Sequence, residues 1–594
     1  MKNIFLLLLF LFGNQYEGIA SKKEYRNQPT ITKKVLLIGI DGLQLEKLNA
    51  LETPNFDVFN IEKAYGGGIV GTTSQQTTGS GPGWMTILTG VWNDKHGVIS
   101  NDTVNKAKAK SIFQYLKEHN NNFQTTSIAT WSPIHHFLDD KMMYVDRRFD
   151  GGTDYEATEK VVGELQNNNS DFLFVHYSEP DNIGHRYGYG NEYNQSIKEM
   201  DGYLGKIMKL VNNRSKEKNE QWLVILTTDH GRRGEGNHHG SQTVEEKTIF
   251  VGMNHSGNEE FNTIVPEVPI QDYNGIYQHM PQTSIVPTIL TYFDIKIDAR
   301  WQLASSSLIG EVGPRRVMVQ PNNNTLWWYS KSLGYAKIYK NNILIDSVPA
   351  QKRTYKLNER QNKTSTYTIV INGQSGSAIR KNIQINVGMD WGNDEQVLIY
   401  NDKTYVRYLM GKNKAKDKNP KVMSNKDWHG VEAYAEKIEA AFRLDKEKMF
   451  LFLNDGRFIL FNIQENRIED GYPNEITNTT WPGLEPYKNG IVAAVKINDS
   501  VVYFFIRDGR YMVYNLKENK TETTYAQAIN ENTLPGLSAY APKISAAINS
   551  SPRWFYVLLN DNTYLKYDKI KNKVLSAYPK PINNKNWPKN KRTN

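Results

Sequence analysis

Ser80 lies in a segment whose composition suits a nucleophile. The sequence around it reads TTGSGPGWMTIL, so Gly79, Gly81 and Gly83 surround the hydroxyl just before an apolar run. A serine hydroxyl held in such a turn can attack phosphorus once a neighbouring group lowers its pKa. A serine among glycines is also a common turn residue. Residues elsewhere in the chain decide between these two interpretations.

A first set of metal-type ligands follows two apolar runs. Asp41 ends the run KKVLLIGID, and Asp229 and His230 end the run QWLVILTTDH. The sequence contains no Cys, so a metal must be held by His, Asp, Glu and hydroxyl groups. Together with the Ser80 hydroxyl, these side chains offer the ligand types that a zinc-class ion accepts.

A second set of ligand types comes from two further segments. Asp181 and His185 in EPDNIGH are four residues apart, so one helical turn places both side chains on the same side. The segment GNHHG then supplies a third ligand, either His238 or His239. Taken singly, each of these residues is typical of a cap or a surface position. Taken together, the two sets predict a site for two divalent ions, and the concentration of His in this part of the chain agrees with it.

Three continuous apolar runs must position these residues. They begin at Lys34, Asp171 and Gln221, and each reads as a buried strand of a parallel sheet. Amphipathic segments lie between them, at 105–119 and 191–211, with apolar residues at helical spacing. The pattern predicts a doubly wound α/β domain over residues 32–312, in which ligands bind beyond the carboxyl ends of the strands.

The remainder of the chain reads as β structure. Residues 313–388 contain short β-type runs between Asn, Gly and Lys turns, which predict a small β-sandwich similar to fibronectin type III. Residues 390–588 repeat with a period of 53, since NDKTYVRY, NDGRFILF, RDGRYMVY and NDNTYLKY begin at 401, 454, 507 and 560. Four such units predict a four-bladed β-propeller. We therefore expect a multidomain chain.

Composition and termini restrict the class of protein. The first 20 residues combine Lys2, an apolar run and the small residues Gly18 and Ala20, which is typical of a cleaved signal peptide. We expect a secreted protein, extracellular or periplasmic, without a transmembrane segment. The formal net charge of +9 is spread over a chain of 594 residues, and no nucleic-acid motif accompanies it.

The repeats at 390–588 resemble hemopexin-like repeats, with GYP at 471 and WPG at 481 in similar places. The first unit departs from the pattern because it lacks the Ala-Ala strand start of the later units. The resemblance implies an ion in the central channel and binding of proteins or glycans at the rim. A purely structural appendage is the alternative.

The catalytic motifs resemble the alkaline phosphatase superfamily, with the nucleotide pyrophosphatase/phosphodiesterase-like enzymes as the nearest branch. The motifs are IDG, SGPG with the later TG and HG, EPDNIGH, TDHG and a final HG, in this order. The resemblance implies two metal ions, of zinc type, one held by Asp41, Ser80, Asp229 and His230 and the other by Asp181, His185 and His239. It favours His239 over His238, and it makes Asn101 the residue that holds the phosphate.

The chain departs from that branch in ways that affect the substrate. Ser80 stands where the phosphodiesterases usually have Thr, and Gly83 stands where their motif has Asn. The K-x-R pair of the related monoesterases is missing, although Arg147 and Arg148 could replace it. Trp131, His135 and His136 are candidates for the leaving-group pocket, with core or surface roles as the alternative. A sulfatase is disfavoured because position 80 is not Cys.

These features predict a phosphodiesterase or nucleotide pyrophosphatase that works through a phosphoseryl intermediate formed on Ser80, with a phosphodiester or nucleotide as substrate. Two alternatives remain open. The first is a phosphomonoesterase that uses the same metals. The second is a binding protein whose propeller recognises an ion, a protein or a glycan while the hydrolase domain is idle.

Overall fold

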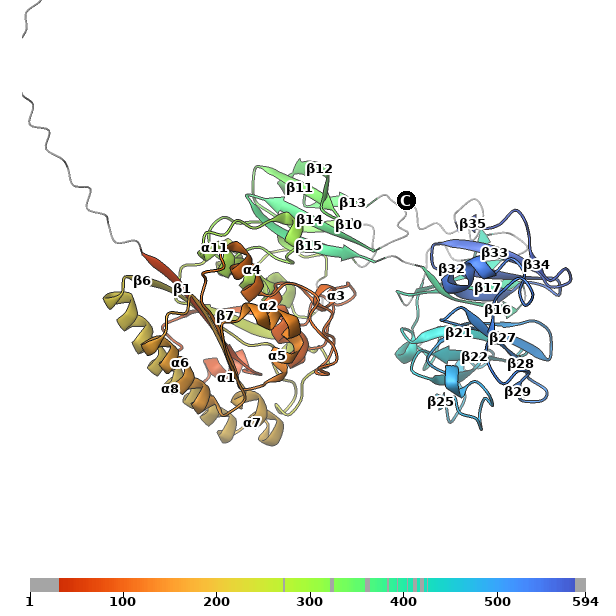
Figure 1. The fold of residues 1–594 in the computed structure, drawn as a ribbon, viewed down its shortest axis with the longest axis horizontal. Coiled ribbons are helices and arrows are strands. Elements are labelled where there is room, and N and C mark those ends of the chain that lie inside the picture. The colour runs from red at the N-terminus through yellow and green to blue at the C-terminus, as the bar shows by residue number, and fades with distance from the viewer. Residues whose placement is uncertain are drawn as a thin grey trace, which may run out of the picture. The chain divides into compact units, whose positions relative to one another are not determined.

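The computed structural model describes residues 31–582, apart from 271–272, 321–324, 358–363, 382–383, 393, 403, 410–413, 417–420 and 425. The expected signal peptide at 1–20 and Trp587 of the last repeat lie outside the described residues. The chain forms two compact units. The first contains residues up to 357 together with 366–380, and the second contains 358–365 and everything after 380 (Figure 1).

The three apolar runs form neighbouring parallel strands. Strand β1 (Thr32–Ile40) lies between β5 (Phe172–Tyr177) and β6 (Glu220–Thr227) and is parallel to both. Buried side chains cover both faces of β1, which explains why its sequence is continuously apolar and not alternating. The prediction of parallel strands is confirmed for these three runs.

The whole sheet has eight strands in the order β4-β3-β5-β1-β6-β7-β2-β8. The strands not yet located are β2 (Asn60–Tyr65), β3 (Thr125–Ala129), β4 (Arg147–Asp150), β7 (Thr248–Met253) and β8 (Met280–Pro281). The sheet is mixed, because β7 is antiparallel to both β6 and β2. The expectation of a parallel sheet therefore holds from β4 to β6, which includes the three strands that precede the candidate ligands, and fails at β7.

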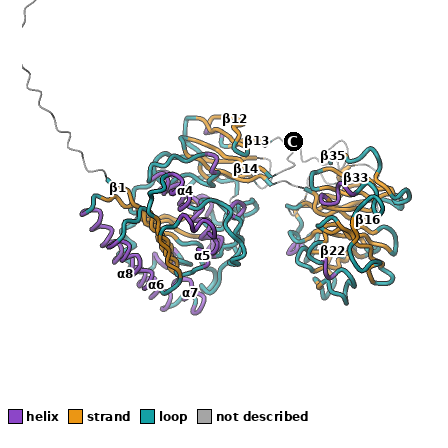
Figure 2. The backbone as a smooth tube through the Cα atoms, viewed as in Figure 1, coloured by secondary structure: helices purple, strands orange, loops and turns teal. Residues whose placement is uncertain are grey.

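Helices cover both faces of this sheet (Figure 1). One face packs against α2 (Ser80–Thr89), α4 (Ile112–His119), α5 (Pro133–Leu138) and α11 (Ile285–Tyr292). The other face packs against α1 (Leu45–Asn49), α6 (Asp154–Asn167) and α8 (Asn191–Glu217). Figure 2 shows that helices are concentrated in this first unit, while the second unit consists mainly of strands and loops. The first unit therefore contains an α/β domain.

The helix boundaries differ from the sequence expectation. The helix expected from residue 105 begins only at Ile112, where the Ser111 side chain accepts a hydrogen bond from the backbone N–H of Gln114. This N-cap satisfies one of the free donors of the first turn and ends the preceding loop. Helix α8 begins at Asn191 as expected and continues to Glu217, beyond the predicted end. No described helix is long and apolar enough to cross a bilayer.

Two small antiparallel sheets complete the first unit. One contains β9 (Arg315–Val319), β10 (Thr325–Tyr329) and β13 (Thr354–Lys356). The other contains β11 (Tyr335–Lys340), β12 (Ile343–Pro349), β14 (Ser365–Ile371) and β15 (Gln374–Arg380). Leu326, Trp328, Ile338 and Ile369 form part of the core between them. The two antiparallel sheets therefore share one core.

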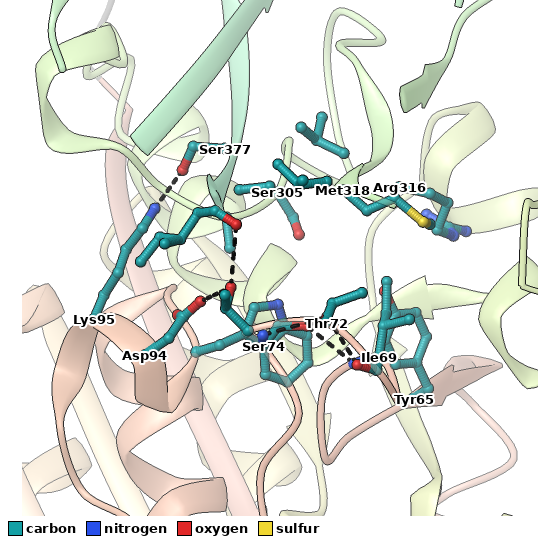
Figure 3. Close-up of a pocket in the computed structure, with 17 residues that line it drawn as sticks. Tyr65, Ile69, Thr72, Ser74, Asp94, Lys95, Ser305, Arg316, Met318 and Ser377 are labelled. Atoms are coloured by element: carbon teal, nitrogen blue, oxygen red, sulfur yellow. Dashed lines mark hydrogen bonds between the residues drawn. The ribbon is translucent and has the colours of Figure 1, made fainter. Parts of the chain in front are cut away.

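Charged groups join these sheets to the α/β domain. The buried carboxylate of Glu260 pairs with both Arg315 and Arg316 at the start of β9. Figure 3 shows a second contact, in which Lys95 of the α/β domain donates a hydrogen bond to Ser377 of β15. The pocket between the layers has a volume of about 20 Å³. It has room for about one water molecule, so it is too small to bind a substrate.

The described residues of the second unit form four sheets of five strands each. Their bounds are β16 (Ile385–Gly392), β17 (Glu395–Tyr400), β18 (Thr404–Leu409), β19 (Lys414–Ala415) and β20 (Lys421–Val422); β21 (Ile438–Arg443), β22 (Lys448–Leu453), β23 (Arg457–Asn462), β24 (Arg467–Ile468) and β25 (Asn474–Glu475); β26 (Ile491–Lys496), β27 (Val501–Ile506), β28 (Arg510–Asn515), β29 (Lys520–Thr521) and β30 (Gln527–Ala528); β31 (Ile544–Asn549), β32 (Trp554–Leu559), β33 (Thr563–Asp568), β34 (Lys573–Val574) and β35 (Lys580–Pro581).

The first strands of the four sheets are neighbours in a cycle. β16 packs beside β21, β21 beside β26, β26 beside β31, and β31 beside β16. Each of these strands pairs with the next strand of its own sheet in antiparallel register. The predicted sandwich extended to residue 388, but the residues from Ile385 onward belong to β16 and so to the first repeat. Small residues such as Ala441 and Ala494 allow these strands to approach one another.

Candidate active site

Three aspartates lie beyond the carboxyl ends of adjacent strands. Asp41 directly follows β1, and Asp229 comes two residues after β6. Asp181 is in the first turn of α7 (Glu179–Tyr187), which follows β5. Because β5, β1 and β6 are neighbours and parallel, their carboxyl ends meet at one edge of the sheet. All three side chains are largely buried.

Helix α2 brings Ser80 to this edge. Ser80 is the first residue of the helix, and its Oγ lies 3.3 Å from Nε2 of His230. The helix can approach closely because position 83 is glycine. A Cβ atom there would lie 2.9 Å from the Cβ and the carbonyl oxygen of Asp229. The glycine-rich composition around Ser80 is therefore a packing requirement as well as a turn signal.

The first ligand group surrounds Nε2 of His230. This nitrogen is 3.5 Å from Oδ1 of Asp41 and 3.3 Å from Oδ2 of Asp229. Both oxygen atoms are buried and have no hydrogen-bond partner among the described residues. Unpaired buried carboxylate oxygens are costly unless a cation compensates them. Two carboxylates, one imidazole and the Ser80 hydroxyl fit a divalent ion of the zinc class.

The electrostatics of this group agree with a bound cation. Burial raises the pKa of Asp229 well above its ordinary value, and the charges of Asp41 and Asp181 raise it further. Burial also lowers the pKa of His230 to about 4, with a further contribution from His239. The imidazole of His230 is therefore neutral at pH 7 and can act as a ligand. A divalent ion would relieve the repulsion between the carboxylates.

The second ligand group consists of Asp181, His185 and His239. Nε2 of His185 lies 3.3 Å from Oδ2 of Asp181, and Nε2 of His239 lies 3.7 Å from Oδ1. The two Nε2 atoms are 3.0 Å apart. Asp181 and His185 come from one face of α7, as their spacing predicts. The ligand atoms of Asp181, His230 and His239 also lie close together, so His230 adjoins both groups.

The other ring nitrogens determine the tautomers of these histidines. Nδ1 of His185 donates to the carbonyl of Asn237, and Nδ1 of His239 donates to the carbonyl of Thr78, both at 3.0 Å. A carbonyl only accepts, so each Nδ1 carries a proton, and it is Nε2 of each ring that faces Asp181 and can bind a metal ion once it is unprotonated. Two such nitrogens and a carboxylate that face one another again fit a cation.

The two candidates for the last ligand differ in their surroundings. His239 stacks on the His230 ring with 3.8 Å between ring centroids. His238 instead forms a backbone bridge with Arg233.

Asn101 lies close to the nucleophile, because its Oδ1 accepts a hydrogen bond of 2.8 Å from the N–H of Gly81. This bond holds the amide oxygen at the start of α2, and the amide NH₂ group has no hydrogen-bond partner among the described residues.

Two residues that the sequence did not single out support Asp41. Its Oδ2 receives hydrogen bonds from Nε2 of His176 at 3.2 Å and from Nε1 of Trp84 at 3.1 Å. Nδ1 of His176 in turn accepts from the Thr130 hydroxyl at 3.0 Å. These bonds occupy Oδ2 and leave Oδ1 directed at His230. The available signal was a histidine near the end of an otherwise apolar strand.

Arg232 is the third residue that was missed. Its guanidinium is fully buried, and Nη1 pairs with Oδ1 of Asp181. Burial works to raise the pKa of Asp181, but the hydrogen bond from His185 and the nearby positive charge of Arg232 keep that pKa below its usual range. The closeness of Gly184 and Gly42 to the guanidinium leaves no space for larger side chains at these positions. The charge of Arg232 thus lies directly behind the second ligand group.

Most of the residues considered for the K-x-R role or for the leaving-group pocket bind other groups of the protein. Arg147 donates to Glu164 at 2.8 Å, and Arg148 pairs with Asp150. His135 is buried, where it bonds to Ser127 and to Asp150. His136 is exposed, and Trp131 packs against Phe137. Neither arginine is therefore a free cation that could replace the missing K-x-R pair, and His135 has a structural role.

Comparison with known proteins agrees with this geometry. Residues 35–325 match the family model for type I phosphodiesterase / nucleotide pyrophosphatase. The chain is similar to GPI ethanolamine phosphate transferase 2 of Schizosaccharomyces pombe, with 23% identity over 50% of this chain and 40% of the relative. It is also similar to bis(5'-adenosyl)-triphosphatase ENPP4 of Pongo abelii, with 24% identity over 38% of this chain and 52% of the relative.

Among solved structures, a plant lectin with two metal-binding sites from Cicer arietinum matches 34% of this chain and 96% of the lectin, with 17% identity and a TM-score of 0.29. The chain spans about half the length, or less, of the two curated relatives. The family match covers every candidate ligand and the candidate nucleophile. Residues 35–325 are a domain of the type I phosphodiesterase / nucleotide pyrophosphatase family, within the alkaline phosphatase superfamily.

Proposed function

We propose that the protein is a metal-dependent phosphodiesterase of the nucleotide pyrophosphatase type, with Ser80 as the nucleophile. The observation that carries this proposal is the convergence of two ligand groups beside the Ser80 hydroxyl. Asp41, Ser80, Asp229 and His230 would hold one divalent ion, and Asp181, His185 and His239 the other. When bound, zinc-class ions lower the pKa of an attacking hydroxyl and compensate the charge of the leaving oxygen.

The residues of the chain then have separate tasks. Ser80 Oγ forms a bond to phosphorus while the bond from phosphorus to the leaving oxygen breaks, and the leaving group departs as an alcohol or a nucleotide. The amide of Asn101 donates to a non-bridging oxygen and holds the phosphoryl group during this step. Water then attacks the phosphoseryl ester, which releases the phosphate monoester and restores the Ser80 hydroxyl.

A diester substrate is favoured over a monoester by the position of the cations. A monoester dianion carries one more charge, which a site usually compensates with added cations. Arg147 and Arg148 are bound to carboxylates, and Arg232 is buried behind Asp181. Asn101 offers a neutral donor in their place.

The same geometry supports transfer to an alcohol as a second candidate function, because one relative is a phosphoethanolamine transferase by name.

The test uses purified protein with an aryl phosphodiester, an aryl phosphomonoester and an aryl sulfate, with and without a chelator. We expect hydrolysis of the diester, its loss with the chelator and its recovery with zinc. Ser80→Ala should lower kcat by about 10³-fold or more, and Asn101→Ala should lower it by about 10²-fold with metal content unchanged. Preference for the monoester would refute the diesterase, and full activity of Ser80→Ala would refute the nucleophile. Addition of an alcohol acceptor distinguishes transfer from hydrolysis by the product.

We also propose the wider organisation of the chain. The 53-residue period and the cyclic packing of β16, β21, β26 and β31 support a four-bladed, hemopexin-like propeller at 390–588. The two small sheets support a fibronectin-type sandwich at 313–388, next to a catalytic domain at 32–312. An ion in the propeller channel stays a prediction, as do protein or glycan partners at its rim. Export through a signal peptide at 1–20 is a further proposal.

A further inference from the structure

The hairpin after the second strand of each repeat provides an internal comparison. In three sheets the residue before the conserved Asp donates its backbone N–H to the residue before the first strand. These bonds join Asn454 to Lys437 at 2.8 Å, Arg507 to Gly490 at 2.7 Å, and Asn560 to Lys543 at 2.8 Å. The positions are therefore equivalent in the structure as well as in the 53-residue alignment.

In two of the repeats, the residue before the first strand is a lysine that pairs with the conserved Asp. Nζ of Lys437 lies 2.9 Å from Oδ2 of Asp455, and Nζ of Lys543 lies 3.2 Å from Oδ2 of Asp561. In the third repeat the equivalent residue is Gly490, which has no side chain to reach the conserved Asp508. Asp508 keeps only the pair with Arg510 on its own hairpin, which corresponds to the pair of Asp455 with Arg457 in the second repeat. The third repeat thus lacks the side chain that covers this place in its neighbours.

A groove of about 450 Å³ is present beside Gly490. Its walls are the short helix Glu485–Tyr487 and the hairpin between β27 and β28, whose strands are labelled in Figure 1. This volume is within the range of small-molecule sites, which is about 300–1,000 Å³. The groove lies wholly within the second unit and is separate from the candidate active site.

The third repeat also adds cations at the groove. Lys488 stands where the second and fourth repeats have Ala435 and Ala541, and Arg507 stands where they have Asn454 and Asn560. The Lys488 ammonium has no ion pair among the described residues. Arg507 uses Nη2 to bind Glu439, and its other guanidinium nitrogens have no side-chain partner in the described part of the chain.

Both acidic residues of the groove have partners, although only Asp508 is paired with a cation. Two nitrogens of Arg510 bind Asp508, and Oε2 of Glu485 accepts the N–H of Asn478 at 3.1 Å. The charge of Arg510 is therefore compensated by Asp508. Lys488 and the guanidinium nitrogens of Arg507 other than Nη2 remain available to a ligand. Cationic donors of this kind make short, strong hydrogen bonds to sulfate and phosphate oxygens.

From these observations, we propose that the groove beside Gly490 binds an oxyanion ester, a sulfate or phosphate group carried on a body the size of a monosaccharide. Lys488 and Arg507 bind the oxyanion. The space left by the missing lysine accepts the body of the ligand, which lies between Tyr487 and the hairpin. The equivalent places in the second and fourth repeats do not bind it, because Lys437 and Lys543 fill them.

Calorimetric titration of the full chain tests this site. The probes are glucose 6-sulfate, glucose 6-phosphate and glucose, and a chelator is present so that the phosphate ester cannot bind through metal ions at Ser80. We expect at least one of the two esters to bind. Glucose should bind at least about tenfold more weakly than that ester, because each charge-assisted hydrogen bond contributes on the order of a tenfold effect on affinity. The ester that binds better identifies the anion.

Repeat-swapping variants provide the matched controls. Gly490→Lys introduces the residue of the second and fourth repeats and should lower the affinity about tenfold or more. Lys437→Gly opens the same place in the second repeat, without the added cations, and should leave the affinity unchanged. Arg507→Asn and Lys488→Ala introduce residues that neighbouring repeats already have, and each should weaken binding.

Three results would overturn the proposal. The first is absence of binding of either ester at roughly millimolar concentration. The second is equal affinity for glucose and its esters. The third is unchanged affinity in Gly490→Lys, judged on a variant whose melting temperature matches the wild type. If Gly490→Lys does not fold, unchanged affinity in both Arg507→Asn and Lys488→Ala overturns it equally.

Discussion

At the scale of single residues, Arg232 explains how the two ligand groups differ. The first group has two carboxylates, Asp41 and Asp229, with unpaired oxygens. The second has only Asp181, and the buried guanidinium of Arg232 already pairs with it. By charge alone, a divalent ion is held more tightly by the first group than by the second. Arg232 thus makes the second group the weaker metal site.

Replacement of Arg232 by Met tests this difference. Loss of one partner of a buried ion pair costs about 3 kcal/mol or more, so the metal-free variant should be less stable than the metal-free wild type. Zinc should stabilise the variant more than the wild type, because Asp181 is then free to bind it. Thermal melting with and without zinc measures both effects. Arg232→Lys is the control that keeps the charge, and equal zinc-induced shifts in all three proteins would contradict the idea.

At the scale of elements, the loop before α2 is held by residues near α9 (Val244–Lys247). The Thr78 hydroxyl donates to Glu246 at 2.7 Å and accepts the N–H groups of Gly240 and Gln242 at 3.2 and 3.1 Å. The carbonyl of Thr78 accepts Nδ1–H of His239. One residue therefore connects the loop that carries the nucleophile to the loop that carries a ligand.

Thr78→Val keeps the shape of this side chain and removes its hydroxyl. Two backbone N–H groups then lose their acceptor, which costs about 1–3 kcal/mol and loosens the loop that holds His239. We expect the affinity for the second metal ion to fall about 10–100-fold while the first ion still binds. Competition with a fluorescent zinc chelator measures the two affinities. Thr78→Ser should behave like the wild type, and a loss of both ions together would argue against this connection.

Lys247 holds the same loop from its other end. Its buried ammonium donates to the carbonyls of Gly67 and Gly68 at 2.8 and 2.9 Å. Burial lowers the pKa of Lys247 to about 7. Between pH 7 and the ordinary lysine pKa of about 10.4, the unfolded chain therefore binds a proton that the folded chain releases. The contribution of this residue to stability must rise with pH in that window.

The corresponding measurement compares the wild type with Lys247→Met. From pH 7 to pH 10, the free energy of unfolding of the wild type should rise relative to that of the variant, by up to about 4 kcal/mol. Denaturant titrations at several pH values give this difference, and the other titrating groups cancel between the two proteins. Parallel stability curves would show that the Lys247 pKa is not lowered in the folded state.

At the scale of the whole molecule, the chain consists of two compact units with separate cores. Every candidate metal ligand belongs to the first. Calorimetry of the full chain should therefore show two unfolding transitions, because the cores do not share their cooperativity. Removal of zinc should lower the first unit's transition and leave the other in place. A single transition that shifts as a whole would mean that the units unfold together.

Much of the fold followed from local patterns. Continuous apolar runs identified β1, β5 and β6, and the 53-residue period identified four equivalent sheets, because both patterns depend on neighbours along the chain. The mixed character of the sheet was not predicted. The direction of β7 depends on the path that the chain takes between β6 and β7, and the hydrophobic period of a strand does not encode that path. The start of α4 was also misplaced, because the cap at Ser111 was not recognised.

By itself, the sequence determined which residue types lie at the strand ends, and therefore the candidate ligands Asp41, Asp181 and Asp229. Only the tertiary structure decided what surrounds them. His176 is 135 residues from Asp41, and Arg232 is 51 residues from Asp181. Contacts over such distances arise from packing and leave no local signal. The 53-residue period aligns Gly490 with Lys437 and Lys543, but only the fold shows the groove beside Gly490.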